Sequence, residues 1–160
     1  ALLGENMSSR LFQNIREEHG LAYSIHSQTS FFQDTGDIVV SAGLDDDQLV
    51  KTLKLAVKEL RLLREKNVPA SELRRAKDYV IGQMEMSLEN TEPQMTWLGE
   101  HWLGYGRLPD PDSIQQGLNR VTAAEIRAAA AVCFRPERCA LALVSPMKNA
   151  GHLRPVLEKI

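Results

Sequence analysis

The sequence predicts an α+β domain, a two-layer sandwich in which helices pack on one face of a largely antiparallel sheet. Residues 23–31 alternate with a period of two and are followed by an apolar run at residues 38–42, a pattern typical of a β-hairpin. Helically spaced apolar stripes fill the middle of the chain. The run CALALV predicts a returning, buried strand over residues 138–145. At 160 residues, the chain is long enough for one domain with a sizeable core.

The first predicted helix precedes the hairpin. Its apolar face is formed by four side chains at helical spacing: Met7, Leu11, Phe12 and Ile15. Ser8 or Ser9 is a candidate N-cap, and Gly20 is a natural residue to end the helix. The hairpin turn is expected at residues 34–36, and at least one of Phe31 and Phe32 is expected to pack.

Further helices are expected between the hairpin and the last strand. Asp45, Asp46 and Asp47 offer capping and favourable dipole charge to a helix whose apolar stripe is Leu49, Leu53, Val57, Leu60 and Leu63. Pro69 precedes a long helix with the stripe Leu73, Ala76, Val80, Met84 and Leu88. Pro93 is expected to end or kink this helix, and another then carries Met95, Leu98 and Trp102. A loop is expected at 104–111, and Thr122 with Glu125 forms a capping box for a helix to about Cys133.

Composition excludes some classes of function. The net charge of −2 without a basic block gives no electrostatic support for nucleic-acid binding, and no apolar run is long enough to span a bilayer. Cys133 and Cys139 are expected to be two reduced, buried thiols rather than a disulfide. None of the four histidines stands in an HxxEH or HExxH arrangement, so the chain offers no recognisable zinc motif.

The most informative segment is SSRLFQNIREEHGLAYS, residues 8–24. It places Arg16 in the last turn of a helix and Tyr23 at the mouth of the next strand, with the chain reversing at Gly20. Two donors brought to one point suit a carbonyl oxygen or an oxyanion. The alternative from the residues alone is that Arg16 pairs with a neighbouring glutamate or a helix carbonyl and that Tyr23 is an ordinary strand residue.

This segment resembles the non-catalytic C-terminal half of the pitrilysin/insulysin-type zinc peptidases, the inverzincins, and is most similar to their processing-peptidase branch. The resemblance continues in order through FFQDTGDIVVSAGL, SELRRAKDYVIGQMEMSLEN, YGRLPDPDSI and VTAAEIRAAAAVCFRPERCALALVSP. It implies the metallopeptidase LuxS/MPP-like fold. It also implies that residues 1–160 are a single domain, an N-terminally truncated C-terminal half whose preceding strand and helix are missing. Such a truncated sheet would expose an edge and some apolar surface.

The resemblance implies an assisting role in peptide hydrolysis. Arg16 would bind a substrate carbonyl and Tyr23 would stabilise the oxyanion, with Gly20, Leu21, Ala22 and Ser24 contacting the substrate. Gly4-Glu5-Asn6 departs from the family's glycine-rich turn, although Asn6 tolerates a positive φ, so the turn is expected to survive.

The resemblance places the zinc outside this chain. The family holds zinc with an HxxEH motif in its other half, whereas the nearest string here, WLGEH at residues 97–101, has Trp97 where the first ligand would stand. The chain alone is therefore expected to bind no zinc and cleave nothing. The implied partners are an N-terminal, HxxEH-containing half or subunit, an unfolded peptide substrate and a second copy of the chain. No nucleic acid and no membrane span are expected.

A second interpretation belongs to another class of function. The same fold serves as a catalytically inactive scaffold or peptide-recognition subunit, as in the core subunits of the respiratory bc1 complex. An HxxEH motif upstream of Ala1 or in a co-purifying partner would separate the two interpretations. The sequence leaves both the cytoplasm and the periplasm open as the compartment of a bacterial-type protein.

Overall fold

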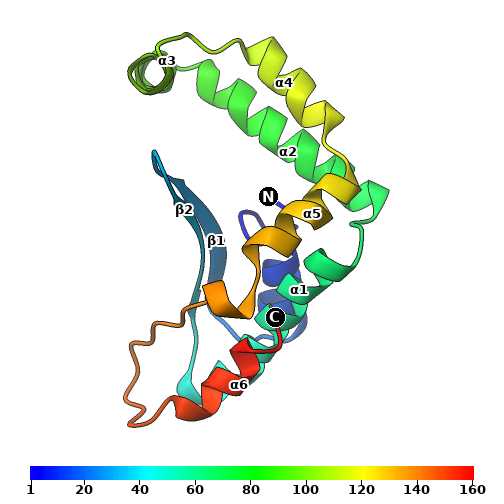
Figure 1. The fold of residues 1–160 in the computed structure, drawn as a ribbon, viewed down its shortest axis with the longest axis vertical. Coiled ribbons are helices and arrows are strands. Elements are labelled where there is room, and N and C mark those ends of the chain that lie inside the picture. Colours follow the sequence, from blue (N-terminus) through cyan, green and yellow to red (C-terminus); the bar gives the residue numbers. More distant parts are fainter. The chain divides into compact units, whose positions relative to one another are not determined.

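The computed structural model describes residues 1–160 and divides them into two compact units, residues 1–68 with 124–160 and residues 69–123. Figure 1 shows the order of the elements along the chain. The elements are η1 (Phe12–Glu18), β1 (Ser24–Phe31), β2 (Gly36–Gly43), η2 (Asp46–Gln48), α1 (Leu49–Glu65), α2 (Ala70–Leu88), α3 (Thr91–Tyr105), α4 (Pro111–Arg120), α5 (Ala123–Cys133), η3 (Pro136–Arg138), η4 (Gly151–Leu153) and α6 (Arg154–Leu157). No helix is long and apolar enough to cross a membrane.

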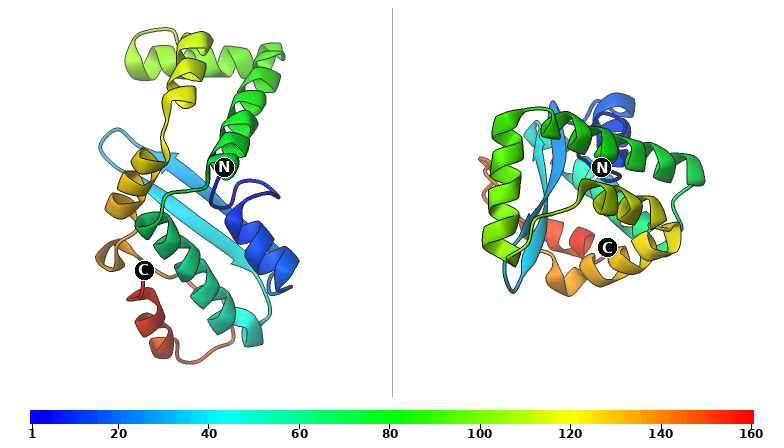
Figure 2. Two further views of the ribbon diagram at one scale, coloured as in Figure 1. Left: turned by 90° about the vertical axis from the view of Figure 1, so that its right-hand side faces the viewer. Right: turned by 90° about the horizontal axis from the view of Figure 1, so that it is seen from above.

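The predicted hairpin and the α+β class are confirmed. β1 and β2 pair antiparallel, from Ser24 opposite Gly43 to Phe31 opposite Gly36. Successive side chains of a strand point to opposite faces, so the hairpin has two distinct surfaces. One carries Ile25 and its partner Ala42, and Figure 2 shows α1 running alongside the strands. The other carries His26 and its partner Ser41.

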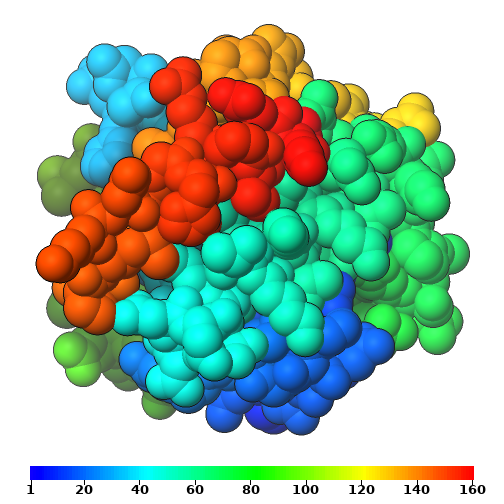
Figure 3. All heavy atoms as spheres, turned by 90° about the horizontal axis from the view of Figure 1, so that it is seen from below, coloured from blue at the N-terminus to red at the C-terminus, as the bar shows by residue number.

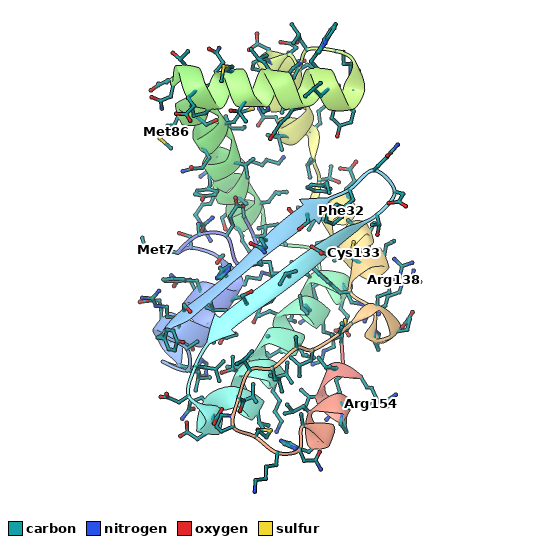
Figure 4. All side chains as sticks on the ribbon, turned by 90° about the vertical axis from the view of Figure 1, so that its left-hand side faces the viewer. Met7, Phe32, Met86, Cys133, Arg138 and Arg154 are labelled. Atoms are coloured by element: carbon teal, nitrogen blue, oxygen red, sulfur yellow. The ribbon has the colours of Figure 1, made fainter.

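The tip of the hairpin differs from expectation. Phe31 is 86% exposed and Phe32 is 62% exposed, so the prediction that at least one of them packs is wrong. Figure 4 shows Phe32 at the turn between the two strands. Strands of eight residues carry both rings to the far end of the hairpin, where no other element of this unit covers them.

The prediction of a buried strand over residues 138–145 is wrong for this chain. Arg138 closes the short η3 helix, and the segment that follows has no ladder partner. Val144 is fully exposed, and Leu141 is 37% exposed. A strand exists only where a neighbour supplies hydrogen bonds to its backbone. The sheet consists of β1 and β2 alone, and residues 139–144 take no part in it.

The core of the first unit lies between η1, α1 and the C-terminal helices. Ile15 on η1 and Leu11, which directly precedes η1, are completely buried, and Leu153 is 1% exposed. Val156 and Ile160 pack on Val57 of α1. Figure 3 shows the C-terminal residues, in red, lying against the blue-green surface of α1. Each fully buried side chain of this size contributes about 1.5–3 kcal/mol to folding.

Helix α1 follows the predicted stripe, but its capping differs. The structure gives Asp45 no side-chain capping bond, and Asp46 instead accepts a 2.7 Å hydrogen bond from the hydroxyl of Ser145. Asp47 accepts a 3.0 Å bond from the side-chain amide of its neighbour Gln48, so the predicted capping by the aspartate side chains is wrong. Asp46 and Asp47 still place negative charge in the first turn of η2, where it complements the helix dipole.

The second unit consists of α2, α3 and α4 and has no buried residue. The long helix ends at Leu88, and Pro93 lies in the first turn of α3, where its missing N–H costs nothing. Helix α3 continues to Tyr105 and ends at Gly106 with a φ of +65°. The expected loop at 104–111 is therefore shorter than predicted.

Helix α4 was not predicted, although its start has a clear local signal. The carboxylate of Asp110 accepts hydrogen bonds of 3.3 Å from the backbone amides of Asp112 and Ser113, and Pro111 occupies the first helical position. Lys77 of α2 donates a 2.8 Å bond to the carbonyl of Asn119, which ties α4 to α2.

Replacing Leu11 by alanine tests the position of the core. Leu11 has no exposed surface, so Leu11→Ala should lower the free energy of unfolding by about 2–5 kcal/mol. The same substitution at Leu103, which is 87% exposed, should change it by less than about 0.5 kcal/mol. Urea denaturation of both variants checks the difference, and equal losses would contradict this assignment of the core.

Candidate functional site

The reversal between η1 and β1 centres on Gly20. Its φ is +59°, a left-handed conformation that glycine adopts without strain, and the prediction that it ends the helix is confirmed. The amide of Leu21 donates to the carbonyl of Ile15 at 2.9 Å, and the amide of Gly20 donates to the carbonyl of Arg16 at 3.1 Å. This is the pattern of a Schellman cap with each bond reaching one residue further back, as expected because the helix is wound as a π-helix.

Backbone carbonyls, and not a serine side chain, satisfy the start of this helix. The amides of Arg10 and Leu11 donate to the carbonyls of Leu2 and Leu3 at 3.0 and 2.9 Å. The hydroxyl of Ser9 donates to the carbonyl of Asn6, so the predicted serine N-cap is wrong. The preceding residues turn back over the helix and supply the acceptors.

The Gly4-Glu5-Asn6 turn survives, but by a different device from the one predicted. No residue other than glycine has a positive φ, so Asn6 uses its side-chain oxygen, which accepts a 2.8 Å bond from the amide of Ser8. The carbonyl of Gly4 accepts a 2.7 Å bond from the amide of Ser27. A Cβ on Gly4 would lie 2.8 Å from that nitrogen, so the missing side chain permits the contact.

A buried carboxylate fixes η1 against α1. Glu59 on α1 is only 7% exposed. Its Oε1 accepts a 2.8 Å hydrogen bond from Nδ2 of Asn14, and its Oε2 lies 3.8 Å from Nη1 of Arg10. A buried charge that lost these partners would be strongly destabilising. The contact therefore sets the orientation of the helix that carries Arg16.

Arg16 is exposed and stacks on its own helix. Its guanidinium carbon lies 4.9 Å from the centroid of the Phe12 ring, a cation–π contact. The alternative in which Arg16 pairs with a neighbouring glutamate is wrong, because its side chain makes no ion pair and no hydrogen bond. The N–H groups of the guanidinium are therefore open to a ligand.

Tyr23 is 74% exposed at the entrance to β1. Its amide donates to the carbonyl of Gly43 at 2.9 Å, and its ring lies against Gly43 on the face of the hairpin that also carries Ser41. The phenol makes no hydrogen bond. Arg16 and Tyr23 thus lie on either side of Gly20, and no hydrogen bond or ring contact joins them.

The structure separates the other predicted substrate-binding residues. Gly20 is exposed and Ser24 is half-buried. Leu21 and Ala22 are 5% and 7% exposed, so their side chains belong to the core. Only the backbone of these two residues can meet a peptide.

The histidines do not form a metal site. The chain contains no group of three His, Cys, Asp or Glu side chains placed to hold a metal ion. A ring nitrogen of His19 lies 2.7 Å from the carbonyl of Asn14. His101 lies 5.0 Å from the ring of Trp97 and 5.7 Å from that of Tyr105, measured between centroids. The arrangement of these side chains therefore does not fit a zinc ion.

A cavity of about 670 Å³ lies within the first unit, between the hairpin, α1 and residues 133–143. Its lining is mostly apolar and includes Thr52, whose buried hydroxyl has no hydrogen-bond partner. Cys133 and Cys139 also line it, and both are free thiols, as predicted, but Cys133 is exposed and Cys139 is only half-buried, so their predicted burial is wrong. Burial, and to a lesser extent the Glu137 carboxylate, raises the pKa of the Cys139 thiol above its usual value, so this sulfur is protonated at neutral pH.

Comparison with known proteins identifies the kind of domain that this fold represents. Residues 1–80 match the family model described as Peptidase M16 inactive domain, and the chain belongs to this family. It is 35% identical over 148 residues to the uncharacterized zinc protease YmxG of Bacillus subtilis, covering 92% of this chain and 36% of that protein. The chain thus spans about a third of the length of the curated relatives that it matches.

Solved structures share the fold. A peptidase M16 inactive domain from Pseudomonas fluorescens is 20% identical with a TM-score of 0.70, covering 82% of this chain and 32% of that one. A chain of Complex III2 from Candida albicans is 16% identical with a TM-score of 0.74, covering 94% of this chain and 36% of that one. These likenesses confirm the predicted fold, and the match to the inactive-domain family confirms the predicted family.

Two glycine substitutions test the reversal. Gly20→Ala should destabilise the chain by about 1 kcal/mol, because alanine is strained in the left-handed region. Nothing lies within 4 Å of an added Cβ at either Gly20 or Gly82, so the comparison isolates the backbone effect. Gly82→Ala, within α2, should instead stabilise by about 0.5–1 kcal/mol. Thermal unfolding of both variants checks the opposite signs, and the same sign in both would refute the role given to Gly20.

Proposed function

We propose that this chain is the non-catalytic half of a zinc-dependent metalloendopeptidase, in which Arg16 and Tyr23 bind the peptide substrate and stabilise the transition state. The observation that carries the proposal is the pair of exposed donors, without hydrogen-bond partners, on either side of the Gly20 reversal. Membership of the inactive-domain family and the naming of relatives as zinc proteases support the same assignment.

Arg16 and Tyr23 are suited to different steps of peptide hydrolysis, substrate binding and stabilisation of the transition state. The guanidinium of Arg16 presents several N–H donors in a fixed plane, which suits a peptide carbonyl oxygen. The phenol of Tyr23 donates one hydrogen bond, which strengthens as negative charge develops on the oxygen of the scissile carbonyl. Stacking on Phe12 limits the freedom of Arg16, so less entropy is lost when it binds.

The partner in this proposal is a catalytic half that carries the zinc and the HxxEH motif, in the same polypeptide or in a second subunit. A zinc ion in that half would polarise the carbonyl and activate water. This chain would contribute substrate binding and oxyanion stabilisation through Arg16 and Tyr23. We further propose that a segment of the partner pairs as a strand beside residues 139–144. The apolar cavity and the unpaired backbone after η3 support this proposal.

Substitution of the two donors tests the assignment in the full-length parent. Arg16→Ala and Tyr23→Phe should each lower kcat/KM for peptide cleavage by about 10²–10³-fold, because each removes a donor to the reacting carbonyl. Their melting temperatures should stay at the wild-type value, since both side chains are exposed. Matched controls are Arg154→Ala and Tyr105→Phe, which change exposed side chains of the same type elsewhere. Wild-type turnover in both test variants would sink the proposal.

The alternative function is a scaffold or peptide-recognition subunit without catalysis. The likeness in fold to a chain of Complex III2 favours it as the second candidate. In that case the parent would hold no zinc, and Arg16 and Tyr23 would at most bind peptides.

Metal removal separates the two candidates. The full-length parent should contain zinc and cleave unfolded peptides, and a chelator should abolish cleavage because the activated water is lost. Residues 1–160 alone should bind no zinc and cleave nothing. Metal analysis and a peptide-cleavage assay on both proteins in parallel provide the measurement. A parent without zinc or cleavage would favour the scaffold.

A further inference from the structure

We propose that Gly43 is a positioning residue for Tyr23, and that its missing side chain is what allows the phenol to lie where the proposed function needs it. This inference deepens the proposed function and rests on it. Gly43 is the last residue of β2 and pairs with Ser24, next to Tyr23 in sequence.

Two separate contacts tie Tyr23 to this glycine. At the backbone, the amide of Tyr23 donates to the carbonyl of Gly43 at 2.9 Å. At the side chain, the ring lies against the space where a Cβ of residue 43 would stand. An added Cβ would be 2.5 Å from the phenolic oxygen and equally close to the ring, and real Cβ atoms do not approach other atoms so closely.

The need for glycine here is not conformational. The φ of Gly43 lies outside the left-handed region, because Gly20 and Gly106 are the only residues with positive values. Alanine could therefore adopt the same backbone, and in a strand it would ordinarily stabilise the fold. A position where alanine fits the backbone but collides with one side chain indicates that the glycine serves that side chain.

The contact with Gly43 determines on which face of the hairpin the ring of Tyr23 lies. The side chains of residues 41 and 43 point to the same face of the hairpin, away from the face that carries Ile25 and Ala42. The ring of Tyr23 therefore lies on the polar face. A methyl group at residue 43 would lift the ring off this surface and move its hydroxyl from the position of an oxyanion donor, where small displacements are costly.

The test uses the full-length parent with four variants. Gly43→Ala should lower kcat roughly a hundredfold, as Tyr23→Phe does, with KM little changed. The double variant should be no slower than Tyr23→Phe alone, because Gly43→Ala acts only by displacing the hydroxyl that Tyr23→Phe has already removed. Ser41→Ala, on the same face of the same strand, should keep wild-type kcat. The melting temperature of Gly43→Ala should not fall.

The outcomes separate this inference from the function on which it rests. Wild-type kcat in Gly43→Ala, with Tyr23→Phe impaired, would reject the positioning role and leave the proposed function intact. Independent, multiplying losses in the double variant would also reject it. Wild-type kcat in Tyr23→Phe would reject the proposed function itself.

A measurement without turnover tests the contact directly. With glycine-selective ¹³C labelling of the parent, the Hα resonances of Gly43 should be shifted by the ring current of Tyr23, and Tyr23→Leu should abolish that shift. An unshifted Gly43 in the wild type would show that the ring does not lie there and would overturn the inference.

Discussion

The left-handed backbone at Gly20 is the constraint on which the candidate site depends. It lets η1 end and the chain reverse at once into β1, with the amides of Gly20 and Leu21 still bonded to helix carbonyls. A cation on the last helical turn and a phenol at the start of a strand are thereby separated only by a tight reversal. The buried Glu59 carboxylate then holds the helix on α1, so the reversal is anchored to the core.

The two faces of the hairpin differ: one is apolar and lines the cavity, and the other is polar. Ile25 and Ala42 lie on the face that lines the apolar cavity, where burial stabilises the unit. His26, Ser41 and the glycine at residue 43 lie on the other face. Because strand side chains alternate strictly, one pair of strands can support a core and present polar groups at the same time. Tyr23 belongs to the second surface because residue 43 has no side chain.

Local signals are reliable where the controlling atoms lie within a few residues. Gly20 ends its helix, the period-two pattern pairs as a hairpin, and the apolar stripe of α1 packs as expected. Even the missed helix α4 has its signal in the Asp110-Pro111 pair. Two predicted caps are wrong because the side chains have other partners. The hydroxyl of Ser9 donates to the carbonyl of Asn6, and the carbonyls of Leu2 and Leu3 accept from the helix amides instead. The carboxylate of Asp46 accepts a hydrogen bond from Ser145, far away in sequence.

The sequence by itself determined the α+β class, the reversal at Gly20 and the two residues that flank it, because turns, caps and periodicity act over one or two helical turns of chain. Only the tertiary structure decided that residues 139–144 do not form a strand and that Phe31 and Phe32 are exposed. The physical reason is that strand pairing and burial depend on which neighbours are present in space. A run of apolar residues forms a buried strand only where other segments pair with it and cover it, and the run itself does not determine whether they are present.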